Sequence, residues 1–312
     1  MSRIVISGAS GDLGRRVTKL LLKNTAHEDL TLVTRTPGKL SDRAAQGIRV
    51  LQGEYQDRES LDAAYLGAET LFLISGLNLG RRIAEHRNAI AAAQRAGIRH
   101  IVYTSVSGVQ PNNPAMSAKD HYQTELDLRA SGLKFTFLRN ALYSEIVSSI
   151  QIAPAAASGR LEMATGSGSL APAAKADVAR AAAAVLQDPQ EHEGAVYEIT
   201  GPQLLNYEDI ARIGAEIYDS PIAYTPVTPE ERQAFFDSIG MPRTYDPNMP
   251  LNPDGHLWAS DELVTADMAV AQGYQAVLSQ HVKQITGQEP ETLRSVMERV
   301  KSTRYDLIEE TV

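Results

Sequence analysis

Cysteine is absent from this sequence, and aromatic residues are few. The 312 residues include one tryptophan and five phenylalanines. Without cysteine the chain can form no disulfide bond, no thiol nucleophile and no cysteine-ligated metal site. No uninterrupted apolar run approaches the length of about 20 residues that spans a bilayer. We therefore expect an ordinary globular protein that has no membrane partner.

Positive charge is also in short supply. Lysine and arginine number 30 against 38 aspartates and glutamates, so the formal net charge is −8, and no basic run offsets it. Because an acidic chain repels phosphate backbones, we expect no nucleic-acid partner. Residues 1–7 run straight into a strand pattern without a charged and apolar leader, so we expect a cytoplasmic location. The sequence does not fix the oligomeric state, and a homo-oligomer stays open.

Signatures of two other chemistries are missing as well. None of the seven histidines lies in a His-Glu-x-x-His motif or at another metal-ligand spacing, so we expect no metal site. No G-x-S-x-G motif is present to carry a serine nucleophile for acyl transfer.

Two periodicities alternate in the first half of the chain. Apolar residues at helical spacing, for example Leu13, Val17 and Leu20, separate short runs of β-branched or apolar residues. Strands that alternate with helices need crossover connections, which produce a parallel sheet covered on both faces. The sequence therefore predicts an α/β fold, a doubly wound parallel Rossmann sheet with a smaller, mainly helical C-terminal lobe. The expected strands are Ile4–Ser7, Leu30–Thr34, Ile48–Gln52, Thr70–Ile74, Ile101–Thr104 and Phe135–Leu138.

The alternation loosens beyond about residue 141. Residues 153–157, which include Pro154, and the Gly/Ser/Ala-rich residues 164–174 predict irregular structure. A helix at about 176–186 and a last strand at 196–200 are expected next. From Tyr207 the pattern is mainly helical, except for an extended loop over the four prolines of residues 241–254.

These patterns suggest a division into two interleaved parts. We expect residues 1–140 to form the Rossmann domain, completed by residues from about 175–200. Residues 141–174 and 201–312 would form a substrate-binding lobe. The region around Tyr245, His256 and Trp258 could cover a substrate pocket, although a loop that packs on its own core explains it equally well.

The strongest chemical signal follows the first strand. Its residues are Gly8-Ala9-Ser10-Gly11-Asp12-Leu13-Gly14, a G-x-x-G-x-x-G loop that opens a helix. Glycines permit the tight turn, the close approach of backbone to a pyrophosphate and the packing of helix on strand. Phosphates then meet amide groups at the positive end of the helix. An ordinary glycine-rich turn is the alternative, but the place of the loop in an α/β chain favours a dinucleotide site.

The end of the second expected strand distinguishes NAD from NADP. An NAD site usually offers a carboxylate there to the ribose hydroxyls, whereas this strand ends in Thr34-Arg35. A guanidinium suits a 2′-phosphate because its planar fork can donate two hydrogen bonds. Lys39 could add a second positive charge. Although both side chains could simply be solvated, we expect NADP(H) as the cofactor.

Several segments resemble one known family. They are Ser7–Gly14, Gly53-Glu54-Tyr55, Leu73–Gly76, Ile199-Thr200-Gly201 and, above all, Thr136–Tyr143. Together they look like the NmrA-like branch of atypical short-chain dehydrogenases, and within it like triphenylmethane reductases and type 2 NADPH:quinone oxidoreductases. The resemblance covers residues 1 to about 245, and the stretch 247–284 is longer than in those relatives. It implies NADP(H) as cofactor and hydride transfer to a quinone or a dye.

The proton relay of ordinary short-chain dehydrogenases is missing. No tyrosine is followed by lysine four residues later, so the Tyr-x-x-x-Lys motif is absent. His121 is the best replacement, as a proton donor or an orienting group, since histidine titrates near neutral pH. A histidine in the first turn of a helix, where we expect His121, can also be only a polar contact.

The carboxyl ends of the expected strands supply further candidates, because doubly wound sheets bind ligands there. Ser75, Gly76 and Asn140 are expected to contact the cofactor, and Tyr143 is paired with His121 as a candidate catalytic residue. Core positions are the alternative for Asn140 and Tyr143. Thr104 and Ser105 are equally well explained as satisfied hydroxyls of the sheet.

Two functions of different classes fit these residues. The first, which we favour, is an NADPH-dependent reductase of a small planar electrophile, either a quinone or an aromatic dye. The alternative is an NADP(H)-sensing regulatory protein without turnover, since some NmrA-like proteins lack the catalytic tyrosine. A reductase of phenylpropanoid-like metabolites is a third hypothesis, but the lysine of that group would fall near His121. Apolar and aromatic residues available for a pocket favour the first function; they are Leu142, Tyr143, Phe235, Phe236 and Trp258.

Overall fold

Seven strands form one sheet in the order β3-β2-β1-β4-β5-β6-β9. The computed structural model describes residues 3–245 and 259–309. β1 pairs in parallel with both β2 and β4, and the β2–β3 and β4–β5 pairs are parallel too. The strands are β1 (Ile4–Ser7), β2 (Leu30–Thr34), β3 (Arg49–Gln52), β4 (Thr70–Leu73), β5 (His100–Val106), β6 (Lys134–Asn140) and β9 (Val196–Ile199). The predicted α/β class and doubly wound sheet are confirmed.

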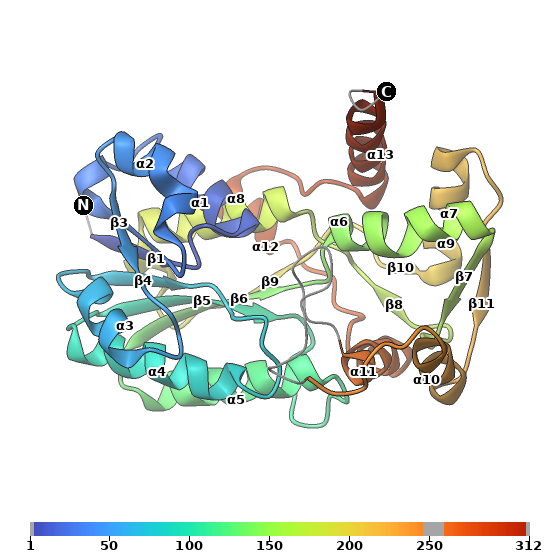
Figure 1. Cartoon of the computed structure of the whole chain (residues 1–312), viewed down its shortest axis with the longest axis horizontal. Coiled ribbons are helices and arrows are strands. Elements are labelled where there is room, and N and C mark those ends of the chain that lie inside the picture. The colour runs from blue at the N-terminus through green and yellow to red at the C-terminus, as the bar shows by residue number, and fades with distance from the viewer. Residues whose placement is uncertain (1–2, 246–258, 310–312) are drawn as a thin grey trace. The chain divides into compact units, whose positions relative to one another are not determined.

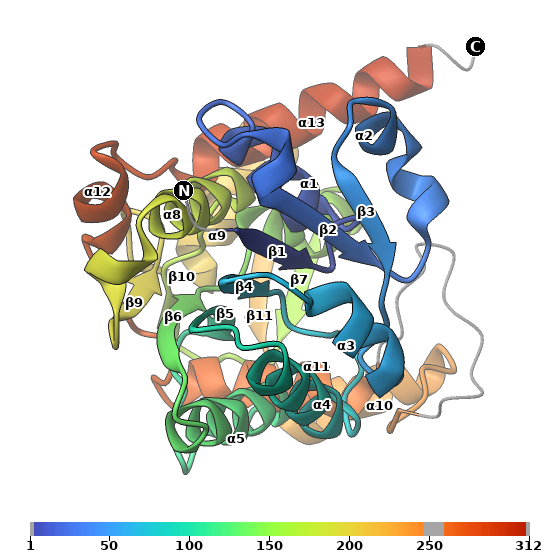
Figure 2. The same ribbon diagram turned by 90° about the vertical axis from the view of Figure 1, so that its left-hand side faces the viewer.

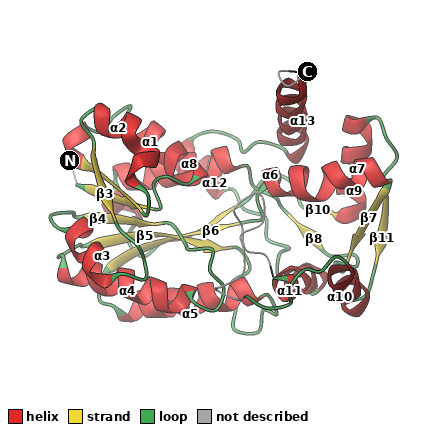
Figure 3. Cartoon of the chain, viewed as in Figure 1, coloured by secondary structure: helices red, strands yellow, loops and turns green. Residues whose placement is uncertain are grey.

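Helices cover both faces of this sheet. In the first unit, α3, α4 and α5 lie on one face and α1, α2 and α8 on the other (Figures 1 and 2), so the strands run between two helical layers (Figure 3). Strands β1 and β4 are buried along their whole length, as expected when both faces are covered. The helices are α1 (Asp12–Leu21), α2 (Ser41–Ala45), α3 (Arg58–Tyr65), α4 (Arg82–Arg95), α5 (Met116–Ala130) and α8 (Lys175–Gln187).

The chain divides into two units, each with a hydrophobic core. The first unit comprises Met1–Ser105, Asp120–Arg139 and Val178–Tyr197. Its core contains Tyr65, Tyr103 and Phe137 among aliphatic side chains of β1, β4 and α4. The second unit comprises Val106–Lys119, Asn140–Asp177 and Glu198–Val312.

Two small sheets and several helices make up the second unit. β7 (Arg160–Met163) pairs in parallel with β11 (Ala223–Pro226), and β8 (Ser169–Leu170) pairs antiparallel with β10 (Leu205–Asn206). Its helices are α6 (Ser144–Ile146), α7 (Ala153–Ser158), α9 (Tyr207–Tyr218), α10 (Pro229–Ser238), α11 (Ser260–Ala271), α12 (His281–Thr286) and α13 (Leu293–Glu309). The core of the unit gathers side chains of α9, β7, β8, α13 and neighbouring segments.

The sequence prediction is wrong in two places of the second unit. Residues 153–157 are helical: a π-helical turn (Val147–Ile152) leads into α7. Pro154 lies in the first turn of α7, where its missing amide donor costs nothing. The two short strand pairs were not expected from the mainly helical pattern. The expected lid residues His256 and Trp258, and most of the proline-rich loop, lie outside the described residues.

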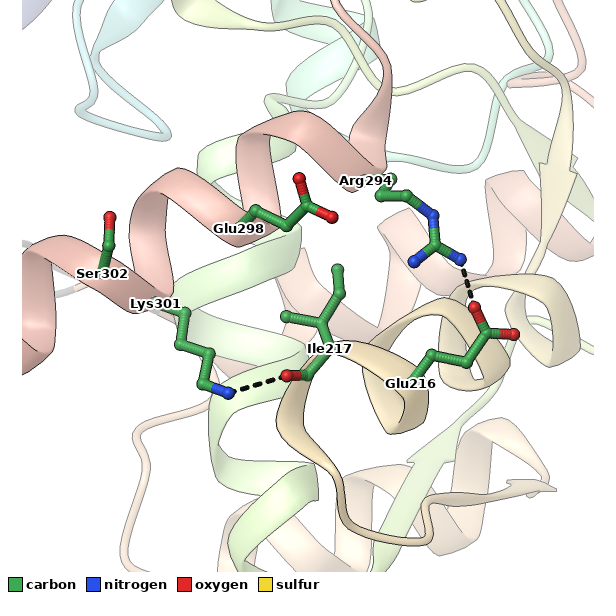
Figure 4. A pocket seen from close by; sticks show the side chains of 6 residues that line it. All are labelled: Glu216, Ile217, Arg294, Glu298, Lys301 and Ser302. Carbon is green, nitrogen blue, oxygen red and sulfur yellow. Dashed lines mark hydrogen bonds and ion pairs between the residues drawn. The ribbon is translucent and has the colours of Figure 1, made fainter.

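Helix α13 is fastened to the end of α9. The Lys301 ammonium donates a hydrogen bond to the carbonyl of Ile217 at 2.7 Å, and Arg294 forms an ion pair with Glu216. A lysine that binds a last-turn carbonyl stabilises the end of a helix. Figure 4 shows the shallow pocket between these helices, which is lined by Glu216, Ile217, Arg294, Glu298, Lys301 and Ser302. None of these residues belongs to the predicted site.

No helix in the described part of the chain is both long enough and apolar enough to cross a membrane.

Asp267 is a buried carboxylate inside the second unit. It accepts a hydrogen bond from the amide of Ala164 at 3.1 Å and lies 3.4 Å from the guanidinium of Arg232. Burial raises the pKa of Asp267 to about 6, and Arg232 only partly opposes that shift. Since an unfolded aspartate titrates near 3.9, the folded state holds this proton more tightly. The resulting stabilisation is present at pH values below about 4 and is lost as the pH rises through 6.

We therefore predict an unusual pH dependence for Asp267→Asn. Between pH 5 and 7.5 the free energy of unfolding of the wild type should fall by about 1.4 kcal/mol relative to this variant, which cannot ionise. Urea unfolding at both pH values measures the difference. Asp237→Asn is the control, because Arg243 lowers the pKa of this exposed aspartate, so that it is ionised in both states between pH 5 and 7.5 and its replacement should leave the pH dependence in this range unchanged. An equal pH dependence of wild type and Asp267→Asn would contradict the assignment.

Candidate functional site

The glycine loop after β1 is shaped by backbone contacts. Gly8 has a φ of 74°, which favours glycine, and its carbonyl accepts a hydrogen bond from the Gly11 amide at 3.1 Å. A Cβ on Gly14 would lie 2.6 Å from the Gly8 carbonyl oxygen, whereas one on Gly11 would meet only that oxygen, at 3.4 Å. Gly14 therefore serves the packing of α1 on the turn, and Gly11 leaves space beside the loop.

The start of α1 is suited to an anion. Gly11 is the N-cap of this helix and provides no side-chain cap. Asp12 places its carboxylate on Arg16 at 2.7 Å, which neutralises the acidic first residue, and Leu13 is half-buried. A helix start of this kind presents amide groups and the positive end of the dipole to a phosphate.

Two cationic side chains follow β2, and a third, in α1, contacts the same turn. Arg35 and Lys39 are exposed, as the sequence suggested, and Ser10 bonds Thr34 through their hydroxyls at 2.7 Å. Arg15 was missed: its guanidinium donates to the carbonyls of Ser10 and Lys39. It thus joins the glycine loop to the turn after β2. The only sequence signal was a basic residue directly after Gly14.

Ser75 and Gly76 follow β4 and are held by buried side chains. The Ser75 amide donates to the Thr104 hydroxyl at 2.8 Å, and the Gly76 amide donates to Nε2 of His86 at 3.1 Å. The Gly76 carbonyl accepts from Arg82 at 2.7 Å. Thr104 is therefore satisfied within the sheet, and this segment is rigidly held at the carboxyl end of the sheet.

His121 lies in the second turn of α5, not in the first turn that we expected, because α5 already begins at Met116. Its Nδ1 lies 2.6 Å from the Tyr103 hydroxyl, and the side chain is 6% exposed. Tyr103 comes from β5, so the pair joins strand to helix. No sequence motif connects these two residues.

The expectation that His121 titrates near neutral pH is wrong. Burial lowers the pKa of His121 well below its ordinary value, and Arg82 and His86 add to the shift. His86 behaves in the same way, since burial and Arg82 lower its pKa to about 3. Both imidazoles are therefore neutral at physiological pH, and His121 can act as a neutral hydrogen-bonding group rather than as an imidazolium acid.

Glu125 is a buried carboxylate that the sequence analysis did not identify. Its carboxylate accepts a hydrogen bond from Ser105 at 2.7 Å and two from Arg139, at 2.9 and 2.7 Å. The carboxylate is 4% exposed, so the two-pronged contact with Arg139 compensates the cost of burying its charge. Ser105 is thus a satisfied hydroxyl, which was one of the two explanations left open.

Asn140 ends β6 and belongs to the second unit. Its backbone carbonyl accepts from the Ser107 amide at 2.9 Å, but its side-chain oxygen is buried without a hydrogen-bond partner among the described residues. A buried amide oxygen is normally paired. This oxygen is therefore suited to a donor on a ligand.

Tyr143 lies in the second unit just before α6. It is bridged to Ala173, and the Lys175 ammonium lies 5.7 Å from the centre of its ring. The hydroxyl-bearing ring is half-buried. Lys175 was missed because 32 positions separate it from Tyr143, which no local motif could reveal.

Comparison with known proteins identifies the family of the chain. A family described as NAD(P)H-binding matches residues 8–189. Quinone oxidoreductase 2 of Escherichia coli (strain K12) is 37% identical over 240 residues, which span 77% of this chain and 82% of that protein.

Two solved structures are similar over almost the whole chain. The NADPH-dependent quinone oxidoreductase of Escherichia coli complexed with NADPH has a TM-score of 0.85 and 32% identity, and the match covers 95% of this chain and 99% of that chain. The Citrobacter sp. triphenylmethane reductase complexed with NADP(H) has a TM-score of 0.82 and 27% identity, with the same coverage. The resemblance drawn from the sequence is confirmed.

We predict that an added methyl group will have a much larger effect on stability at Gly14 than at Gly11. Gly14→Ala should lower the free energy of unfolding by about 2 kcal/mol, because its Cβ would press on backbone that cannot move aside. Gly11→Ala should lower it by less than about 1 kcal/mol, the difference between glycine and alanine at an N-cap. Urea unfolding of both variants tests this, and a Gly14→Ala protein as stable as Gly11→Ala would refute the packing role.

Proposed function

The chain belongs to the NAD(P)H-binding family and is an NAD(P)H-dependent oxidoreductase, and we propose that it reduces a small planar electrophile, such as a quinone or an aromatic dye, with NADPH. The observation that carries this proposal is the glycine loop at the start of α1, which has no side-chain cap, and its contact with the end of β2 through Ser10 and Thr34, the residue directly before Arg35. When bound, NADPH supplies the hydride.

The residues of the first unit fit the cofactor. Residues 8–14 would hold the pyrophosphate, since Gly11 leaves room for it and no side chain competes for the start of α1. Arg35, supported by Lys39 and Arg15, would neutralise the 2′-phosphate. Ser75 and Gly76 lie at the carboxyl end of β4, beside the glycine loop, where doubly wound sheets bind their ligands. From the second unit, Asn140 is proposed as a further cofactor residue, because its side-chain oxygen is unpaired among the described residues.

The acceptor would be bound chiefly by orientation. Residues 141–174 and 201–312 are proposed to supply its binding side chains, Tyr143 among them. A neutral His121 is a weak acid, which suits acceptors that need a hydride more than a strong proton donor. No feature of the residues that the structure describes favours the regulatory alternative, which is an outcome of the test below.

The first prediction concerns cofactor preference. Arg35→Ala should weaken the binding of NADPH by about 2 to 3 kcal/mol, the strength of a charged hydrogen bond, and leave NADH almost unchanged. Calorimetric titration of both cofactors measures this. Arg49→Ala is a matched control, because Arg49 is also exposed but begins β3, away from the carboxyl end of the sheet. An equal loss for NADPH and NADH in Arg35→Ala would contradict the 2′-phosphate assignment.

The second prediction concerns turnover. With the best acceptor from a panel of quinones, triphenylmethane dyes and aromatic carbonyls, His121→Ala should lower kcat about tenfold and Tyr143→Ala should raise KM, while NADPH affinity stays constant. NADPH oxidation followed by absorbance gives kcat and KM, and direct titration gives the affinity. If the wild type binds NADPH but oxidises it with no acceptor, the reductase proposal fails and a regulatory role is favoured.

A further inference from the structure

A chain of buried polar groups in the first unit leads from the backbone of Gly76 to His121. The Gly76 amide contacts Nε2 of His86 at 3.1 Å, and Nδ1 of His86 lies 3.0 Å from the Thr124 hydroxyl and 3.5 Å from the Tyr103 hydroxyl. The Tyr103 hydroxyl then contacts Nδ1 of His121 at 2.6 Å. All four side chains are buried, so the position of each proton is constrained.

The first hydrogen bond of this series, between Gly76 and His86, determines which atoms donate and which accept in the others. A backbone amide can only donate, so Nε2 of His86 must be an acceptor and carries no proton. Because His86 is neutral, its single ring proton lies on Nδ1. The Thr124 hydroxyl donates to the Asp120 carbonyl at 2.9 Å, so it is free to accept this proton.

The second link follows from the first. Nδ1 of His86 already carries a proton and cannot accept one from Tyr103. The shortest hydrogen bond of the Tyr103 hydroxyl is the one to Nδ1 of His121, at 2.6 Å, and this imidazole nitrogen is a better acceptor than the Thr124 hydroxyl, which also interacts with Tyr103. A buried hydroxyl proton without an acceptor would cost about 1 to 3 kcal/mol, so the Tyr103 hydroxyl donates to His121.

The hydrogen bond from Tyr103 determines the tautomer of the His121 ring. We infer that Tyr103 and His86 are positioning residues that fix His121 as the Nε2–H tautomer, so that it offers a hydrogen-bond donor to an oxygen atom of the acceptor. This inference rests on the proposed function and narrows its substrate class. Nε2 of His121 has no hydrogen-bond partner in the described part of the chain, and Nδ1 is already used.

A donor at this position distinguishes between acceptors. A neutral Nε2–H can polarise a carbonyl oxygen, as in a quinone, and stabilises negative charge that develops there. It offers nothing to a dye cation whose reacting carbon bears no oxygen. The nearest charged pair, Arg82 with Asp120 at 3.2 Å, is internally compensated. The network therefore favours quinones and other carbonyl compounds over triphenylmethane cations.

The tautomers can be measured without any turnover. In two-bond ¹H–¹⁵N spectra of the labelled full-length protein at pH 7.5, His121 should show an unprotonated Nδ1 and a protonated Nε2, and His86 should show the opposite pattern. His121→Gln and His86→Gln assign the signals. In Tyr103→Phe the His121 signals should move towards an average of both tautomers. A protonated Nδ1 in wild-type His121, or an unchanged His121 spectrum in Tyr103→Phe, would overturn the inference.

Kinetics test the consequence for the acceptor. Tyr103→Phe retains the buried ring and should lower kcat for a benzoquinone about tenfold, with a change of less than about twofold for a triphenylmethane dye cation and for NADPH affinity. Tyr65→Phe is the matched control, since it removes another buried hydroxyl, bonded to Ser7 at 2.8 Å, that touches no histidine. An equal decrease of kcat with the quinone and with the dye would indicate that Tyr103 has only a structural role and would refute the positioning role.

The spectra and the kinetics together distinguish failure of the reductase function from failure of the inference about His121. Absence of turnover with every acceptor, together with the expected tautomers, would refute the proposed function alone. Reduction of the dye but not of the quinone would refute the preference for an oxygen-bearing acceptor and leave the reductase function intact.

Discussion

The contact between α1 and the turn after β1 is the constraint on which the site depends. Gly14 lies so close to the Gly8 carbonyl that no side chain fits, and this contact fixes where the helix begins. Gly8 in turn lies against Ile74, because a Cβ on Gly8 would be 3.5 Å from the Ile74 side chain. The glycine loop and the Ser75–Gly76 segment are thereby held at the same edge of the sheet, where β1 and β4 run parallel.

Behind that edge the protein places neutral polar groups instead of the Tyr-x-x-x-Lys pair. A lysine beside a tyrosine lowers the pKa of the phenol and makes it a usable acid, whereas burial here raises the pKa of Tyr103 and lowers that of His86 and His121. The side chains of His86, Tyr103 and His121 therefore stay uncharged, and the donor or acceptor role of each is determined by its neighbour. Since the histidines stay unprotonated in the folded state, they also favour unfolding when the pH falls below about 6.5.

The sequence was informative where local pattern and structure coincide. Each expected strand of the sheet was found, and the glycine loop opens α1, because alternation of apolar runs and a glycine turn are encoded over a few residues. The helical conformation of residues 153–157 was missed because Pro154 was interpreted as a breaker, although proline is compatible with a first helical turn.

The parts of the site that were missed depend on contacts between distant residues. Tyr103 and His121 come from different elements, as do Tyr143 and Lys175, and Glu125 meets Arg139 only when α5 packs on β6. The pKa of His121 depends in the same way on burial, which the sequence pattern of α5 does not reveal. Residue type alone suggested an ordinary histidine.

Unpaired polar atoms give the most direct indication of what this molecule is built to bind. Most buried side chains of the first unit's network find partners within it, as the penalty of about 1 to 3 kcal/mol for an unmade hydrogen bond requires. Among the described residues of the second unit, Asn140 departs from this rule, because its buried side-chain oxygen has no donor. In the first unit, the hydrogen bond found for His121 uses Nδ1 and leaves Nε2 available to a ligand. One is an acceptor and, on the inferred tautomer, the other is a donor. An acceptor is suited to a ligand that donates a hydrogen bond, and a donor to an oxygen-bearing substrate, so a bound ligand would offset the cost of the unpaired Asn140 oxygen.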